Sequence, residues 1–385
     1  MTLRVLEVKS LQSDHFEESA PVKSRACVLE QFGQPPVVRE FETVPPAEGE
    51  VIVRILAAGV CGSDVHISSG EDPRTPLPII LGHEGCGRIE ELSGDIRDIY
   101  GEALRPGDYV IWERGIFCRS CYYCEVAHRP YLCPNRKTYG ISIGCAEPPY
   151  LQGCYAEHIH LRRGAAFIKL GESDDPAVIA AASCSGATAA HAVEEARIRP
   201  GDSVLVVGPG PLGLFAAAFA HFAGAGTIIM VGKSYHGLRL ELAKEMGASR
   251  IVLSDEGSAE ERVGLIRSLT DGLGANVVLD CAGRPAAMVE YVDCVAPGGR
   301  YVLPGIAVPV GEWPVKPFEQ IARKNVSLQG LWVSDTGHLL SAVRLVQSGR
   351  YPFGKLITHR FGLEEADQGL KVMAERKAVK AALIP

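Results

Sequence analysis

Apolar runs recur through the second half of the chain and alternate with stretches of helical periodicity. The expected strands are Val204–Val207, Thr227–Val231, Arg250–Leu253, Val277–Asp280, Arg300–Leu303 and Ser327–Leu331. The expected helices between them include Leu238–Met246, Ala259–Leu269 and Ala286–Val295. Strands joined by crossover helices are typical of a doubly wound parallel sheet. We therefore predict an α/β nucleotide-binding domain here.

The first half of the chain has a different pattern. Short apolar and β-branched runs at Ala26–Leu29, Val37–Glu40 and Val51–Ala57 are separated by glycine and proline, which favour turns. This alternation predicts a mainly antiparallel, β-rich domain ahead of the nucleotide-binding sheet. The length of 385 residues, which is too long for one typical core, agrees with two domains.

The charge distribution excludes some classes of partner. The net charge is -7 and lysines and arginines do not cluster in the sequence, which argues against nucleic acid or an anionic membrane surface. The stretch between Asp202 and Lys233 carries no formal charge, but Pro209, Pro211 and three glycines would break a membrane-spanning helix. We expect two buried strands with a buried helix between them, and a soluble protein.

The start of the chain bears on the compartment. It carries Glu7, Asp14, Glu17 and Glu18, and it lacks an uninterrupted apolar segment and a small-residue cleavage site, so no secretory signal is expected. A cytosolic location is the prediction. The twelve cysteines then indicate reduced thiols and metal ligation rather than a disulfide framework.

A glycine-rich turn follows the strand Val204–Val207. Gly208, Gly210 and Gly213 have the spacing Gly-x-Gly-x-x-Gly and lead into a helix of small residues. This spacing lets the backbone approach a pyrophosphate, whose charge the free N–H groups of the helix start then hold. A turn that only packs helix on strand is the alternative, but the surrounding strands and helices favour a dinucleotide site.

Two stretches of the β-rich domain carry side chains that can bind a metal. They comprise Cys61, Ser63, Asp64 and His66, followed by His83 and Glu84. A thiolate, an imidazole and a carboxylate flanked by glycines fit an open catalytic zinc site. A buried cysteine and a hydrogen-bonded histidine are the usual explanation for either stretch by itself, so the pairing of the two stretches carries the prediction.

Four further cysteines are regularly spaced, as Cys-x2-Cys-x2-Cys-x8-Cys: Cys118, Cys121, Cys124 and Cys133. Four thiolates this close in sequence can close a tetrahedron around Zn²⁺ with little more than their own loop. We predict a structural zinc lobe, with a run of free thiols as the alternative. Cys184 adds another thiol at the expected domain cleft, where the β-rich region gives way to the helix entering the nucleotide sheet.

The motif Gly82-His83-Glu84, the cysteine lobe, Cys184 and the glycine turn occur in the order found in one family. In these features the chain resembles the zinc-containing medium-chain alcohol dehydrogenase superfamily, over Ser24 to Pro385. The resemblance implies a GroES-like catalytic domain made from both chain ends and a Rossmann domain inserted between them. It divides the chain into an N-terminal extension (1–23), the GroES-like domain with its zinc lobe (24–186), the Rossmann domain (187–332) and the C-terminal part of the catalytic domain (333–385).

The resemblance also implies a catalytic zinc site. Cys61, His83 and Cys184 would bind the metal, with Glu84 as a fourth ligand or exchanging neighbour, and Asp64 would orient His83. Zinc held in this way leaves a position for an alcohol oxygen and lowers its pKa, so that hydride can pass towards nicotinamide. In the reverse direction it polarises a carbonyl.

Further roles follow from the same resemblance. Ser63 would be the first proton shuttle and His66 the outer one, which passes the proton to water. Thr188 and Leu212 fall where the family packs the nicotinamide ring, and Lys380 falls where a cation meets the pyrophosphate.

Some features depart from the family pattern. The gap before Cys133 is about one residue long for the family's lobe, the stretch Glu91–Leu104 is enlarged, and residues 1–23 have no family counterpart. In the enlarged stretch the chain is similar to a subgroup associated with phosphonate catabolism. Because no compact arginine and lysine cluster appears beside the ligand motifs, a phosphonate substrate is not predicted.

The sequence predicts a zinc-dependent, nicotinamide-linked alcohol dehydrogenase or ketone reductase that acts on a small molecule, and the family resemblance implies a homodimer or homotetramer. A polyol or amino-alcohol dehydrogenase is the alternative, since Glu157 matches a carboxylate seen close to zinc in polyol dehydrogenases, whereas Cys184 favours the alcohol type. A non-catalytic dinucleotide-binding protein would need a defective metal site, and no ligand of the site is missing.

An apolar substrate pocket is expected, which favours a medium-sized or cyclic secondary alcohol. The alternative for each aromatic or aliphatic candidate is a place in the core. The candidates are Trp112, Ile116, Phe117, Tyr155, Leu331 and Trp332.

The choice of dinucleotide depends on the end of the second strand. NAD-selective sheets carry an acidic residue there that binds the adenosine ribose, but here the strand ends in Gly232, Lys233 and Ser234. Lys233 and Ser234, with Arg239 further on, could bind a 2′-phosphate. We therefore predict NADP(H) rather than NAD(H), with a solvated surface charge as the alternative for Lys233.

Overall fold

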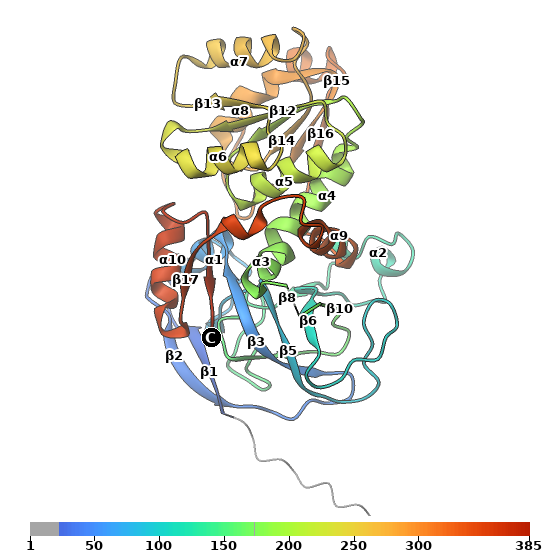
Figure 1. The fold of residues 1–385 in the computed structure, drawn as a ribbon, viewed down its shortest axis with the longest axis vertical. Helices are drawn as coiled ribbons and strands as arrows, with labels where there is room; N and C mark the ends of the chain where they lie inside the picture. Colours follow the sequence, from blue (N-terminus) through green and yellow to red (C-terminus); the bar gives the residue numbers. More distant parts are fainter. Residues whose placement is uncertain (1–22, 173) are drawn as a thin grey trace, which may run out of the picture.

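The computed structural model describes residues 23–385 except Ser173. Residues 1–22 of the expected N-terminal extension lie outside the described residues, and Lys23 is the first residue of β1. The described chain forms a β-rich part at the bottom of Figure 1 and a part with a six-stranded sheet at the top.

The six-stranded sheet is parallel throughout and has the order β13-β12-β11-β14-β15-β16. Its strands are β11 (Ser203–Val207), β12 (Thr227–Gly232), β13 (Arg250–Leu253), β14 (Ala275–Asp280), β15 (Val295–Leu303) and β16 (Ser327–Gly330). All six expected strands are therefore present, and the predicted Rossmann sheet is confirmed. In this strand order the chain reverses direction across the sheet between β11 and β14, where ligands of such sheets bind.

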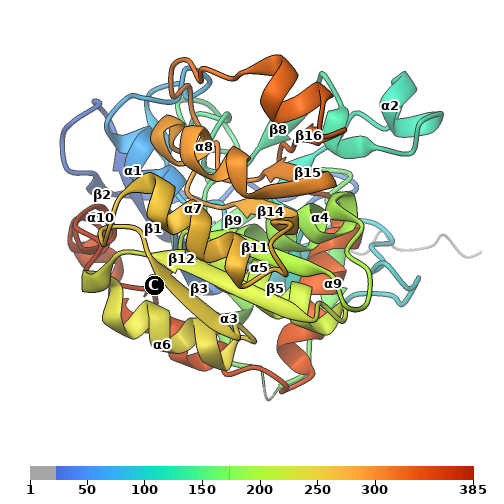
Figure 2. The ribbon, with the colours of Figure 1, turned by 90° about the horizontal axis from the view of Figure 1, so that it is seen from above.

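Helices cover both faces of this sheet (Figure 2). One face is covered by α4 (Ala187–Ala196), α5 (Pro211–Phe222) and α6 (Gly237–Glu245), and the other by α7 (Ala259–Ser268) and α8 (Pro285–Tyr291). Because alternate strand residues point to opposite faces, Val204 and Val206 pack on the α4 side, whereas Leu205 and Val207 pack on the α7 side.

Two expectations for this region have different outcomes. The uncharged stretch after Asp202 forms two buried strands and a largely buried helix, as expected. The expected helix Ala286–Val295 corresponds to α8, which ends at Tyr291, and a short 3₁₀ turn over Val292–Cys294, so only Val295, the first residue of β15, was placed wrongly. The β-branched Val295 fits a strand better than a continued helix.

The β-rich part is built on two sheets. A seven-stranded sheet contains β3 (Val51–Val60), β5 (Gly85–Leu92), β6 (Tyr109–Trp112), β9 (His158–Leu161), β10 (Phe167–Lys169), β17 (Ile357–Phe361) and β18 (Lys380–Leu383). The smaller sheet has β2 (Val37–Glu42), β1 (Lys23–Leu29) and β4 (Ile79–Ile80). Because β18 pairs with β3, the end of the chain is built into the first domain.

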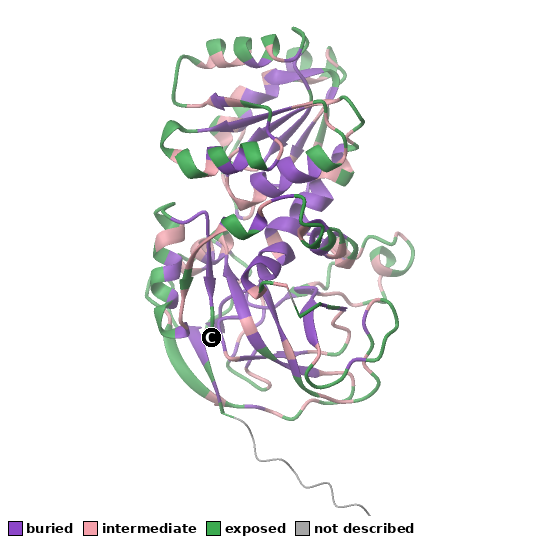
Figure 3. Cartoon of the chain, viewed as in Figure 1, coloured by how far each residue is buried: buried purple, intermediate pink, exposed green. Residues whose placement is uncertain are grey.

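Short elements complete this part. They are α1 (Gly62–Ser68), β7 (Gly115–Ile116), α2 (Tyr122–Glu125), β8 (Lys137–Thr138), α9 (Thr336–Gln347) and α10 (Ala366–Ala374). In Figure 3 the strands of both large sheets are mostly buried, and exposed residues concentrate on the outer helices and loops.

One continuous helical segment connects the two parts. It consists of α3 (Pro176–Ala181), a π-helix (Ala182–Gly186) and α4. The run Pro176–Ala196 is long and apolar enough to cross a membrane, but 83% of its most apolar window is buried inside the protein. Burial in the core explains its composition.

Candidate metal and nucleotide site

Four of the predicted metal ligands come together from three segments. Cys61 ends the β3 segment and caps α1, His83 and Glu84 lie between β4 and β5, and Cys184 is in the π-helix. Each residue offers a ligand atom, and these atoms all lie within 4.8 Å of one another. The Sγ atoms of Cys61 and Cys184 are 3.9 Å apart. An extra residue in a helical turn re-aims a side chain, and π-helical turns are frequent at functional sites.

The orientation of His83 fits a metal. Its Nδ1 atom lies 3.1 Å from Oδ1 of Asp64, while its Nε2 atom is buried and has no hydrogen-bond partner among the described residues. The other oxygen of Asp64 accepts hydrogen bonds from the Cys61 backbone N–H (2.8 Å) and the Tyr155 hydroxyl (3.0 Å). A carboxylate on one ring nitrogen with the other nitrogen free is the usual arrangement of a metal-binding histidine.

The protonation of these ligands is shifted by their neighbours. A hydrogen bond with Cys184 lowers the pKa of Cys61 well below its usual value, against the opposing effect of burial. Burial disfavours the His83 imidazolium, but the carboxylate of Asp64 outweighs this and raises the pKa of His83 to about 10. A depressed thiol pKa favours the thiolate, which is the form that binds zinc.

Glu84 forms an ion pair that the sequence did not indicate. The Nζ atom of Lys380 lies 2.7 Å from Oε1 and 2.6 Å from Oε2 of Glu84, and both side chains are buried. Burial raises the pKa of Glu84 to about 7 although the Lys380 ammonium opposes this. The resemblance implied that Lys380 meets the pyrophosphate, and in the structure its ammonium is paired with Glu84.

The two predicted proton shuttles line the same cavity as the metal ligands. The Ser63 Oγ atom is 3.8 Å from the Cys61 Sγ atom. His66 is on α1 and more exposed, and its Nδ1 atom lies 2.7 Å from Oε2 of Glu71.

The four lobe cysteines also form a cluster. The Sγ pairs Cys121–Cys124 and Cys118–Cys133 are 3.6 Å and 3.5 Å apart, and all four ligand atoms lie within 4.8 Å of one another. Hydrogen bonds from Ser120 lower the pKa of Cys118 to about 5. The longer gap before Cys133 is accommodated by a short 3₁₀ turn, Pro130–Leu132. This donor set fits a closed tetrahedral zinc site.

A cavity of about 300 Å³ joins the metal ligands to the start of α5. Leu331 and Trp332 line it as expected, but Trp112, Ile116, Phe117 and Tyr155 do not. The expectation was wrong for these four. Trp112 and Tyr155 are core residues because the small Gly85 and Gly82 leave space against which their rings pack. Tyr155 instead supports Asp64.

The sequence did not indicate several basic residues that line this cavity. Arg74, Arg114 and Arg136 all line it. The expectation that no basic cluster lies beside the metal ligands was therefore wrong. The three arginines are far apart in the chain and meet only in the fold, so no sequence run could indicate them.

The glycine turn has the geometry of a dinucleotide site. Gly208 has φ +99°, a conformation that favours glycine, and a Cβ on Gly213 would lie 1.9 Å from the Gly208 carbonyl oxygen. Gly210 and Leu212 line the metal-containing cavity together with Thr188. Gly208 and Gly210 line an adjoining cavity of about 410 Å³.

The residues expected at the adenosine end separate into two groups. Lys233 and Arg239 line the adjoining cavity, together with His236 and Arg376, which the sequence did not indicate. Ser234 does not line it, because its backbone N–H and hydroxyl both donate to Asp255 at 2.8 Å. The carboxylate of Glu157 binds Arg25, and Glu157 is neither in the metal-ligand cluster nor in the cavity lining.

Comparisons with known proteins agree with this architecture. Residues 47–172 match the alcohol dehydrogenase GroES-like domain and residues 211–348 match the zinc-binding dehydrogenase domain. The 5-exo-hydroxycamphor dehydrogenase of Pseudomonas putida is 34% identical, covering 89% of this chain and 93% of that protein. A sorbitol dehydrogenase of Halalkalibacterium halodurans is 31% identical, covering 90% and 95%.

Two solved structures are similar over nearly the whole chain. An alcohol dehydrogenase from Thermotoga maritima has a TM-score of 0.91 and 46% identity, covering 94% of this chain and 100% of that chain. A zinc-binding dehydrogenase from Sinorhizobium meliloti bound to NADP has a TM-score of 0.83 and 28% identity, with the same coverage. The chain thus belongs to the zinc-containing medium-chain alcohol dehydrogenase superfamily and is a zinc-dependent, nicotinamide-linked oxidoreductase acting on an alcohol CH–OH group.

Proposed function

We propose that alcohol oxidation and ketone reduction take place at Cys61, His83 and Cys184, which hold the catalytic zinc, with Glu84 as an exchanging neighbour. The observation that carries this assignment is the buried His83 Nε2 atom, which has no partner among the described residues and lies with two thiols in the cavity that reaches the glycine turn. Zinc held there would supply a Lewis acid for the substrate oxygen, and a nicotinamide held at the glycine turn would supply the hydride acceptor or donor.

The residues of the chain then have distinct tasks. Asp64 fixes the ring of His83, and Ser63 accepts the proton of the substrate hydroxyl and passes it outward to His66. Thr188 and Leu212 hold the nicotinamide ring against the metal side of the cavity. The lobe cysteines hold a second zinc that stabilises the fold, and the enzyme is cytosolic and forms a homodimer or homotetramer.

NADP(H) is the proposed dinucleotide. Lys233 and Arg239 supply positive charge along the adenosine cavity and His236 supplies a donor, whereas Ser234 is engaged by Asp255 and is left out of the proposal. The relative from S. meliloti was solved with NADP. The test compares kcat/KM for NADP and NAD in wild type and Lys233→Ala. The preference for NADP should shrink in the variant, and a wild-type preference for NAD would refute the proposal.

Metal analysis combined with a panel of alcohols tests the reaction. Two zinc ions per chain and NADP-linked oxidation of a linear, cyclic or charged monoalcohol support the proposal. A marked preference for polyols would favour the polyol dehydrogenase alternative. Intact dinucleotide binding without turnover of any alcohol by zinc-loaded protein would favour a non-catalytic role.

A further inference from the structure

The cavity that contains the metal ligands is strongly basic. Its lining includes Arg74, Arg114 and Arg136, and among the described residues that line it there is no aspartate or glutamate. Lys380 in the same lining is neutralised by Glu84. Arg239 and Arg376 line both this cavity and the adjoining nucleotide cavity. Arg74, Arg114 and Arg136 do not line the nucleotide cavity, and Arg74 also lines the outer rim near Trp332.

Arg136 is a buried guanidinium with unused donors. Its side chain is 7% exposed, its Nη1 donates to the Thr138 hydroxyl at 2.6 Å, and its Nη2 lies 3.7 Å from Oε1 of Glu113. Its Nε and Nη2 atoms are buried and have no hydrogen-bond partner among the described residues. Burial lowers the pKa of Arg136 to about 10. These two donors lie against Gly115 and beside Glu113, so what Arg136 brings to the cavity it lines is the positive charge of its guanidinium, which favours an anion there.

The backbone makes room for this side chain. A Cβ on Gly115 would lie 2.6 Å from both Nε and Nη2 of Arg136, so the guanidinium can pack against β7 only because residue 115 is glycine. The place of Arg136 is therefore built by the fold and is not that of a loose surface arginine.

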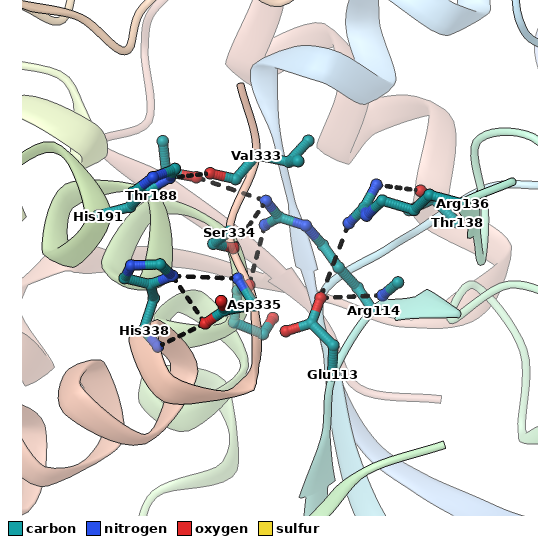
Figure 4. Close-up of polar contacts among 12 residues, drawn as sticks. Glu113, Arg114, Arg136, Thr138, Thr188, His191, Val333, Ser334, Asp335 and His338 are labelled. Atoms are coloured by element: carbon teal, nitrogen blue, oxygen red, sulfur yellow. Dashed lines mark hydrogen bonds and ion pairs between the residues drawn. The ribbon is translucent and has the colours of Figure 1, made fainter. Parts of the chain in front are cut away.

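Arg114 is also buried and is held by neutral acceptors. It donates to the Ser183 carbonyl oxygen (2.9 Å), the Ser334 hydroxyl (3.2 Å) and the Thr188 hydroxyl (3.4 Å), and these contacts and those of Arg136 are drawn in Figure 4. No ion pair joins Arg114 to a carboxylate in the described part of the chain, so these oxygens fix its direction without neutralising its charge.

Arg74 is at the outer edge of the cavity. It forms an ion pair with Asp72 and its guanidinium carbon lies 4.7 Å from the centre of the Trp332 ring. The Arg74–Asp72 pair is neutral as a whole. The buried carboxylate of Glu113 interacts with both Arg114 and Arg136, so these two guanidinium groups together carry one positive charge more than Glu113 offsets. A small anion beside Arg114 and Arg136 would balance that charge.

We propose that the alcohol substrate carries an anionic group, a phosphonate, phosphate, sulfonate or carboxylate, which Arg136 and Arg114 bind while the hydroxyl reaches the metal ligands. This rests on the proposed function. Guanidinium groups bind such oxyanions through charge-assisted, often bidentate hydrogen bonds. The cavity volume of about 300 Å³, which also has to receive the nicotinamide ring, requires a short carbon chain between the hydroxyl and the anion. The arginines thus determine substrate specificity and do not take part in hydride transfer.

Matched substrate pairs test this directly on the zinc-loaded enzyme. The probes are 2-hydroxypropylphosphonate against its dimethyl ester, and 3-hydroxybutyrate against its methyl ester. Wild type should have at least a roughly tenfold higher kcat/KM for the anion of one pair, because a site built to bind a charged group rejects the analogue that lacks it. The pair with the larger ratio identifies a tetrahedral oxyanion or a carboxylate.

Variants assign the preference to Arg136. Arg136→Gln should lower kcat/KM for the preferred anion roughly a hundredfold, mainly through KM, and leave the ester within a few fold, whereas Arg136→Lys should restore part of the loss. Arg250→Gln is the control, because Arg250 is exposed on the edge strand β13. If Arg136→Gln does not fold, the wild-type ratios and Arg136→Lys still decide the matter.

A binding measurement gives a readout besides activity. Methylphosphonate and acetate are titrated against the zinc-loaded enzyme and followed by tryptophan fluorescence, which Trp332 under Arg74 should report. Either anion should bind wild type and Arg250→Gln equally and Arg136→Gln several-fold more weakly.

Three outcomes would overturn the proposal. They are a wild-type preference for the neutral esters, an equal loss for both members of a pair in Arg136→Gln, and weaker NADP binding in that variant with an unchanged anion preference. The last outcome would place the arginine on the cofactor. Absence of any zinc-dependent alcohol oxidation would instead contradict the proposed function, so the two failures are distinguishable.

Discussion

Asp64 makes three contacts that together position two of the metal ligands. It binds Nδ1 of His83, the backbone N–H of Cys61 and the hydroxyl of Tyr155. The carboxylate is fully buried, so its charge acts on His83 without screening by solvent. One residue that touches neither substrate nor metal thus controls the ring direction of His83 and the backbone direction at Cys61.

Replacement of Asp64 by asparagine should weaken zinc binding. The amide keeps the shape but removes the charge that holds the His83 ring, and loss of such a partner costs roughly 10–100-fold in metal affinity or activity. Competition for zinc against a chelator, with turnover measured in parallel, checks this. Tyr155→Phe is the matched control, since it removes one hydrogen bond and keeps the carboxylate, and its effect should be smaller. Unchanged zinc affinity and turnover in Asp64→Asn would contradict this role.

At the scale of elements, the turn between β11 and α5 depends on a close approach of backbone to backbone. Gly213, in the first turn of α5, packs against the carbonyl group of Gly208. Gly210 has open space where its Cβ would be, and it faces the cavities expected to hold the dinucleotide. The two glycines therefore serve different purposes.

This difference is testable. Gly213→Ala should lower the free energy of unfolding by about 1–3 kcal/mol and weaken dinucleotide binding, because backbone must move to admit the methyl group. Gly210→Ala should leave the melting temperature nearly unchanged and weaken only dinucleotide binding, because its methyl group would project where the pyrophosphate is expected. Thermal unfolding and fluorescence titration with NADPH provide the two measurements. Equal melting temperatures for both variants would show that the turn tolerates the methyl group at Gly213.

The cysteine lobe should contribute stability rather than catalysis. Its elements, α2 and the 3₁₀ turn Pro130–Leu132, are too short to fold without a constraint, and a closed zinc site contributes folding energy. Cys121→Ala should lower the melting temperature and the zinc content while the catalytic site keeps its metal. An unchanged melting temperature would argue against a structural zinc.

At the scale of the whole molecule, the sequence predicted those features that depend on a single local pattern. The buried parallel strands read as continuous apolar runs, so the expected Thr227–Val231 and Arg250–Leu253 agree closely with β12 and β13. The ligand set Cys61, His83 and Cys184 was predicted from the family resemblance, which these residues carry in three short motifs, and the structure brings the three side chains together.

Contacts between segments that are distant in the chain could not be predicted from local sequence patterns. An aromatic side chain such as Trp112 or Tyr155 has the same pattern in a core as in a pocket, and only the opposing glycines decide between them. The cavity arginines come from residues 74, 114 and 136, and each looks like an ordinary surface charge in sequence. The partner of Lys380 is Glu84, nearly 300 residues away, and the pairing depends on β18 returning to β3.

In the proposed mechanism the metal holds the reacting oxygen and the glycine turn holds the dinucleotide, so the two functions should separate in one variant. The decisive measurement is the turnover of Cys61→Ala protein shown by metal analysis to have lost the catalytic zinc and kept the lobe zinc. We expect kcat to fall roughly a thousandfold or more, because a Lewis acid contributes several kcal/mol, while NADPH still binds with nearly wild-type affinity. Near-native turnover in that zinc-depleted protein would show that the metal does not hold the reacting oxygen.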